Sequence, residues 1–94
     1  MRRFAALLFA LSLGLLAGAA PTPASAQQSN AVLKRADDSR KAGQYDRAIA
    51  EATEAIKLNG KNAVSYWVRG AAYVGRNDYD QAIADFGLSR TAAS

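Results

Sequence analysis

Gln-Tyr-Asp-Arg-Ala-Ile-Ala-Glu at residues 44–51 is matched further along the chain by Asp-Tyr-Asp-Gln-Ala-Ile-Ala-Asp at residues 78–85, at an offset of 34. Five of the eight positions are identical, and the last position keeps a carboxylate. Arg35 and Arg69 match at the same offset. Self-similarity at a fixed period of this length is typical of proteins built from repeated supersecondary units. The match therefore predicts two copies of one structural unit.

Apolar residues recur in both copies with the spacing i, i+3, i+4, i+7, which favours amphipathic helices. Within each copy, Gly43 or Asn77 separates two helical stretches. Both residue types tolerate the left-handed conformation that ends a helix. The expected fold class is therefore all-α, with two antiparallel helix-turn-helix hairpins. The predicted helices cover residues 30–42, 45–58, 63–75 and the stretch from 79 onward.

The last predicted helix shows two further features. Asp78 and Gln81 have the spacing of a capping box at its start. The sequence that follows has no amphipathic closing helix, so Ile83 and Phe86 are expected to lack cover on one side.

Four aromatic residues of the two copies are expected to lie in the core, namely Tyr45, Tyr73, Tyr79 and Phe86.

A helical hairpin of this period, with these residues, resembles the tetratricopeptide repeat family, over about residues 29–94. The resemblance divides the chain into repeats at 29–62 and 63–94, a fragment of an α–α superhelix. It implies that small residues let the two helices of a repeat approach closely while aromatic residues fill the space beside them. In the second repeat the matching residues are Tyr66, Gly70, Tyr73, Tyr79, Ala82 and Phe86. The first repeat matches less well at its start, where Val32, Ala36 and Ser39 stand.

The same resemblance implies a binding face. In this family the first helix of each repeat lines a concave surface. The positions carried over are Asn30, Leu33, Asp37, Arg40 and Lys41, then Val64, Trp67, Ala71, Val74 and Gly75. The predicted binding residues among them are Leu33, Asp37, Arg40, Val64, Trp67, Ala71 and Val74. Trp67 is the candidate anchor, since tryptophan is enriched among residues that dominate binding energy; packing inside the module is the alternative. Members that bind chaperone tails clamp a carboxylate with a lysine and an asparagine. Leu33 and Asp37 occupy those positions here, so that clamp is not expected.

Residues 1–26 have the order of a secretory signal peptide. Arg2 and Arg3 precede an apolar run at residues 4–20, and the helix-breaking Pro21-Thr22-Pro23 then leads to Ala24-Ser25-Ala26, an A-x-A cleavage pattern. We expect cleavage before Gln27, export to the periplasm or the medium, and membrane contact only through this transient segment. The alternatives are an uncleaved anchor and a twin-arginine signal.

Composition argues against catalysis and against nucleic acid as a partner. The chain has no histidine and no cysteine, so the commonest general base, the commonest metal ligand and the thiol nucleophile are missing. Its carboxylates are expected at helix starts and on solvated faces. Residues 27–94 carry ten basic and eight acidic side chains, a net charge of +2 that forms no basic stripe. Neither an enzyme nor a cofactor is expected.

Residues 27–94 are therefore predicted to be an exported interaction module, an adaptor or scaffold for a protein or peptide in the cell envelope. Two alternatives remain open. One is a structural protein that assembles with copies of itself through the uncovered last helix. The other is a remnant of a longer repeat protein.

Overall fold

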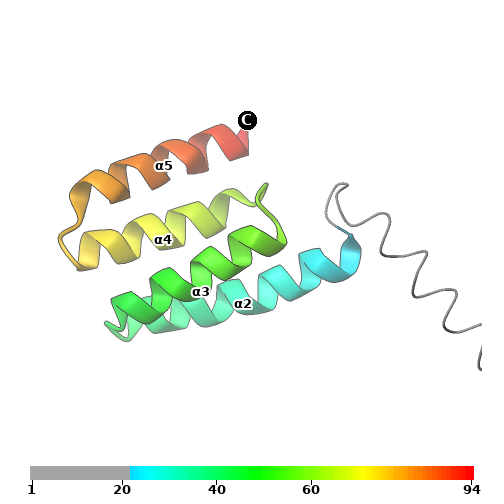
Figure 1. Cartoon of the computed structure of the whole chain (residues 1–94), viewed down its shortest axis with the longest axis horizontal. Helices are drawn as coiled ribbons and strands as arrows, with labels where there is room; N and C mark the ends of the chain where they lie inside the picture. Colours follow the sequence, from blue (N-terminus) through cyan, green and yellow to red (C-terminus); the bar gives the residue numbers. More distant parts are fainter. Residues whose placement is uncertain (1–21) are drawn as a thin grey trace, which may run out of the picture.

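The computed structural model describes residues 22–94, which form helices packed side by side in chain order (Figure 1). Helices α2 and α3 make one antiparallel hairpin and α4 and α5 make the other, with α4 also packed against α2 and α3. The described residues contain no strand. The all-α prediction of helical hairpins is confirmed. The helices span Pro23–Lys41 (α2), Tyr45–Leu58 (α3), Ala63–Gly75 (α4) and Tyr79–Ala93 (α5).

Helix α2 begins earlier than the predicted start, at Pro23. Thr22 caps it, because its side-chain oxygen accepts a hydrogen bond of 3.1 Å from the Ser25 amide. Proline suits the first turn, where its missing N–H would have no helical partner. Pro23, which was expected to break a helix, therefore starts one. The predicted signal peptide lies outside the described residues except for residues 22–26, which form this cap and first turn.

The two hairpin turns have the same backbone geometry. Gly43 has φ +79° and Asn77 has φ +67°, so both residues adopt the predicted left-handed conformation. Each turn is closed by a backbone hydrogen bond of 2.9 Å between equivalent residues, from Gln44 N–H to Ser39 O and from Asp78 N–H to Tyr73 O. The predicted capping box is wrong, since the Asp78 side chain makes no cap hydrogen bond. Its carboxylate instead lies 2.8 Å from the guanidinium of Arg76.

Small side chains let the helices approach closely. Ala48 is fully buried and Ala82 is 2% exposed, which fits their predicted place at helix contacts. Apart from three larger aliphatic side chains, the main core cluster is built from alanine. Its members are Val32, Leu33, Ala36, Ala52, Ala55 and Val68, drawn from both hairpins.

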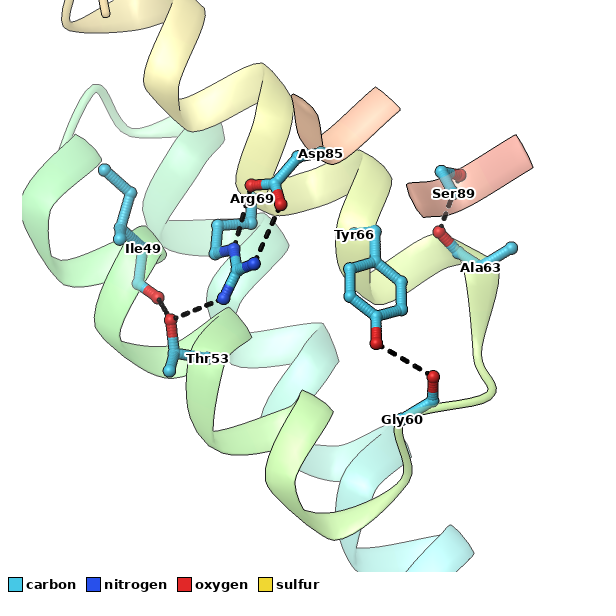
Figure 2. A network of polar contacts seen from close by, with 8 residues as sticks. All are labelled: Ile49, Thr53, Gly60, Ala63, Tyr66, Arg69, Asp85 and Ser89. Carbon is cyan, nitrogen blue, oxygen red and sulfur yellow. Dashed lines mark hydrogen bonds and ion pairs between the residues drawn. The ribbon is translucent and has the colours of Figure 1, made fainter. Parts of the chain in front are cut away.

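A buried or half-buried serine joins the two helices of each hairpin. The Ser29 hydroxyl donates to the Ala55 carbonyl at 2.9 Å, and the Ser89 hydroxyl donates to the Ala63 carbonyl at 2.8 Å (Figure 2). Ser29 and Ala63 are equivalent positions of the two repeats, as are Ala55 and Ser89. The same two positions are thus bonded in each hairpin with donor and acceptor exchanged, which supports the prediction of two equivalent units.

The outer face of α5 lacks a covering helix within the described residues. Tyr45, on α3, packs its ring against Gly75 of α4 and is half-buried. Its equivalent Tyr79 is 56% exposed, so the prediction of a core position for Tyr79 is wrong. No helix follows α5 in the described part of the chain in the way that α4 follows α3. Ile83 is 69% exposed, as expected.

Phe86 differs from its neighbour on this helix. Its ring points back toward α4 and contacts Gly70, where a Cβ atom would lie 2.8 Å from the ring edge. Phe86 is therefore half-buried, covered on the side that faces α4. The absence of a side chain at Gly70 makes the space that the ring fills.

Candidate functional site

An open groove of about 450 Å³ lies between α2 and α4. It brings together five of the seven predicted site residues, namely Leu33, Asp37, Arg40, Val64 and Trp67. Asn30 and Lys41, two further positions of the predicted concave face, also line the groove. Lys34 and Val68 line it as well and were not predicted. The other two predicted residues, Ala71 and Val74, lie further along α4 and do not line this groove.

The α4 wall of the groove is apolar. Val64 is 53% exposed and Trp67 is 47% exposed, although both are residue types that proteins usually bury or half-bury. Leu33 and Val68 lie beneath them as members of the core cluster. Leu33 is therefore part of the floor of the groove and not a freely exposed contact. The role of Trp67 as an anchor stays a prediction.

The α2 wall is charged and centred on Asp37. Its Oδ1 accepts hydrogen bonds from Arg40, at 3.0 Å from Nε and 2.7 Å from Nη2, and its Oδ2 lies 3.1 Å from Lys41 Nζ. Partial burial acts to raise the pKa of this carboxyl, but the hydrogen bonds from Arg40 and Lys41 outweigh it and hold the pKa below its ordinary value. Asp37 therefore stays ionised at neutral pH.

Arg40 connects the two walls. Its guanidinium carbon lies 5.2 Å from the centre of the Trp67 ring, within the range of a cation–π interaction. The ion pair with Asp37 fixes the same guanidinium from the α2 side. Arg40 Nη1 makes no hydrogen bond to any residue in the described part of the chain. The Arg40 guanidinium thus covers one face of the Trp67 ring and keeps its Nη1 free to donate a hydrogen bond.

A second polar cluster was not among the sequence predictions. Arg69 of α4 makes a two-bond ion pair with Asp85 of α5, each bond 2.8 Å long, and its Nη1 donates to Thr53 of α3 at 3.2 Å (Figure 2). Thr53 in turn donates to the Ile49 carbonyl at 2.7 Å. Hydrogen bonding to Asp85 raises the already high pKa of Arg69. Asp85 is 3% exposed, so it is an exception to the expectation that the carboxylates lie at helix starts and on solvated faces.

A signal for this cluster exists in the sequence. Arg69 and Asp85 both have an equivalent of the same charge in the first repeat, Arg35 and Glu51. The match of Arg69 with Arg35 and that of Asp85 with Glu51 can each be seen in the sequence. Helical periodicity does not indicate that Arg69 and Asp85 contact each other. The cluster ties α3, α4 and α5 together and lies apart from the groove, so we assign it a structural role.

Two other hollows are lined mostly by polar and charged residues. One, of about 480 Å³, surrounds residues 43–47 and Arg76. Arg76 is engaged there by Asp46 at 3.0 Å and by Asp78. The other, of about 270 Å³, lies among charged side chains of α2 and α3. Neither has the apolar wall of the groove between α2 and α4, which is therefore the better candidate site.

Residues 22–94 contain neither a metal-binding cluster nor a membrane-spanning helix. No three of their carboxylates gather in a way that would hold a metal ion. None of their helices is both long and apolar enough to cross a membrane.

No protein-family model matches the chain, and no solved structure matches it. The tetratricopeptide resemblance therefore rests on the residues of the two repeats.

Proposed function

We propose that residues 27–94 are an exported protein-interaction module of the tetratricopeptide type, which binds a peptide segment of another protein in the groove between α2 and α4. The observation that carries this proposal is the exposed apolar wall formed by Val64 and Trp67. Exposed apolar surface inside a concave, polar-rimmed site is typical of binding surfaces. No catalytic role is proposed.

The groove suits a peptide better than a small molecule. It is open to solvent and has a charged wall opposite an apolar one. A side chain of a bound segment would lie on Trp67 while its neighbour faces α2. Such pairing of an apolar anchor with a polar rim is common in protein interfaces. The buried residues beneath the groove keep its floor rigid, because Leu33 and Val68 pack in the core of both hairpins.

We expect Trp67→Ala to weaken peptide binding by at least ~2 kcal/mol, or roughly 30-fold, because the variant removes the largest apolar surface in the groove. A library of displayed peptides is selected on residues 27–94, and dissociation constants of the selected peptides are measured for both proteins. The matched control is Leu88→Ala, which removes an exposed apolar side chain outside the groove.

Circular dichroism of each variant separates binding from folding. Selected peptides that bind Trp67→Ala and the parent equally would refute the groove as the binding site. A loss of helical signal in Trp67→Ala alone would show that the ring stabilises the fold and would require Val64→Ser as the second test. Equal losses of binding for Leu88→Ala and Trp67→Ala would point to general destabilisation.

Export is part of the proposal and rests on the order of features in residues 1–26. We expect the protein recovered from the envelope fraction to begin at Gln27, as determined by N-terminal sequencing. Cleavage there removes the Thr22 cap and the first turn of α2 but keeps Ser29, whose bond to Ala55 anchors the helix. Recovery of an intact N-terminus in the membrane fraction would contradict this prediction.

A second candidate function, self-assembly, is favoured by the uncovered face of α5. Tyr79 and Ile83 are exposed, whereas Tyr45, the equivalent of Tyr79, packs against α4. In an end-to-end stack, α2 of a second copy would cover α5 in the way that α4 covers α3. This arrangement is unfavourable, because an exposed ion pair of α2 occupies the positions equivalent to two buried residues of α4. The pair is Lys34 and Asp38, where α4 has Val68 and Ala72. A symmetric pair through two α5 helices avoids this cost.

For residues 27–94 we expect light scattering to give twice the monomer mass, and the melting midpoint to fall on dilution. Ile83→Asp should give monomers, whereas Leu88→Asp, on the same helix but at a position equivalent to the exposed Glu54, should not. A monomer with a melting midpoint independent of concentration would exclude self-assembly.

A further inference from the structure

The groove carries an excess of positive charge on one wall. Its lining includes three cationic side chains and one carboxylate, and its α4 wall has no charged residue. Lys34 has its own partner outside the lining, Asp38 at 3.1 Å. Arg40 and Lys41 share the single carboxylate of Asp37. One positive charge therefore remains uncompensated beside the apolar wall.

The two cations keep free bonding capacity toward the groove. The Lys41 side chain is 64% exposed. Its ammonium group has three N–H donors and pairs with only one oxygen of Asp37. Arg40 keeps its Nη1 free among the described residues and lies over Trp67. A carboxylate entering the groove would meet both cations next to the Trp67 ring.

We propose that the groove selects acidic peptide segments in which a carboxylate side chain lies next to an apolar one, and that Asp37 acts as an internal competitor for the ligand's carboxylate. This inference rests on the proposed binding function and specifies its ligand. The ligand's carboxylate pairs with Lys41 and Arg40, where Asp37 now holds them, and its apolar neighbour covers Val64 and the free part of Trp67.

Charge decides between ligand classes. A basic segment would bring positive charge next to Lys34, Arg40 and Lys41, and like charges in contact repel each other. A neutral segment would gain the apolar contact but leave the excess charge without a partner. Because these groups are partly exposed, a single added ion pair is worth little, and the preference is expected to be modest and sensitive to salt.

The test uses three synthetic peptides, acetylated and amidated at their ends, in which a central Leu-Phe pair is flanked by glutamates, glutamines or lysines. Binding to residues 27–94 is followed by the fluorescence of Trp67, the single tryptophan of the chain. We expect the glutamate peptide to bind about two- to fivefold more tightly than the glutamine peptide, and the lysine peptide most weakly. The preference should shrink when salt is raised to roughly 0.5 M, where surface charges are screened.

Two variants test the assignment of residues. Lys41→Gln should weaken the glutamate peptide about two- to fivefold, while Lys57→Gln, an exposed lysine of α3 outside the groove, should not change it. Asp37→Asn should strengthen the glutamate peptide and leave the glutamine peptide nearly unchanged, because it removes the competitor. Circular dichroism checks that each variant folds.

Equal binding of the glutamate and glutamine peptides, or unchanged binding in Asp37→Asn, would overturn this inference while leaving the groove as a binding site. Failure of all three peptides to bind in a Trp67-dependent way would overturn the proposed function with it. The two failures are therefore distinguishable.

Discussion

Replacing Asp85 with alanine is expected to lower the free energy of unfolding by about 3–5 kcal/mol, the loss typical of breaking a buried ion pair from one side. Asp85 exposes 4% of its side chain and Arg69 exposes 19%. The variant leaves the Arg69 guanidinium enclosed between α3 and α5 with Thr53 as its remaining hydrogen-bond partner and the Tyr66 ring 5.9 Å away. The loss is comparable with the whole stability of a domain of this size, which is about 4–11 kcal/mol.

The cost arises from the orphaned charge and not from the value of the pair itself. Burying both charges has a desolvation penalty that their attraction only partly offsets. The double variant Arg69→Met/Asp85→Leu removes both charges and keeps similar volume. It should therefore recover most of the stability lost in Asp85→Ala. Urea unfolding followed by circular dichroism measures all three proteins.

Asp80→Ala is the matched control, because Asp80 is an exposed carboxylate on the same helix. Its effect should stay within about 0.5 kcal/mol of the parent. If Asp85→Ala melts like Asp80→Ala, Arg69 is not enclosed between α3 and α5 in solution. If the double variant is as unstable as Asp85→Ala, the two charges are worth more to the fold than a well-packed apolar pair.

Helix positions were the part of the fold that the sequence predicted best. The bounds of α3 and α4 agree with the predicted ranges, because apolar spacing and a left-handed residue at each turn leave little freedom there. The start of α2 was missed because a proline was interpreted only as a helix breaker. Its stabilising role at the first turn depends on the preceding Thr22 cap, which the spacing of apolar residues does not reveal.

The groove was predicted in part, and the reasons for the errors are spatial. The resemblance placed Trp67, Val64 and Arg40 on one surface, and they do share a groove. It also included Ala71 and Val74, which lie beyond it, since a face defined by repeat positions runs the length of the helix. Ion pairing between residues far apart in sequence, such as Arg69 and Asp85, depends on how α4 and α5 pack and does not follow from helical periodicity.

The exposed Tyr79 shows where a comparison of repeats fails. An aromatic residue at this position is covered by the next helix, as Tyr45 is by Gly75 of α4. Tyr79 has a similar local sequence but no next helix within the described residues. Burial of a repeat residue thus depends on the helix that packs over it, and a position-by-position comparison of repeats misjudges a residue that has no such helix among the described residues.

Replacing Ala48 or Ala82 with leucine is expected to destabilise the protein by about 1–3 kcal/mol each. Both side chains are buried, and alanine's small volume lets neighbouring helices approach. The added carbon atoms of leucine would force the helices apart or push side chains from their preferred rotamers. Helix propensity does not explain such a loss, because leucine is nearly as good a helix former as alanine.

Ala50 and Ala84 supply matched controls slightly further along α3 and α5. Both are exposed, so Ala50→Leu and Ala84→Leu make the same chemical change without crowding and should stay within about 0.5 kcal/mol of the parent. Thermal and urea unfolding of the four variants gives two independent comparisons at equivalent positions of the two repeats. If the buried and exposed substitutions cost the same, close packing at these two alanines is not what holds the hairpins together, and the equivalence of the two units fails at the positions where their sequences agree best.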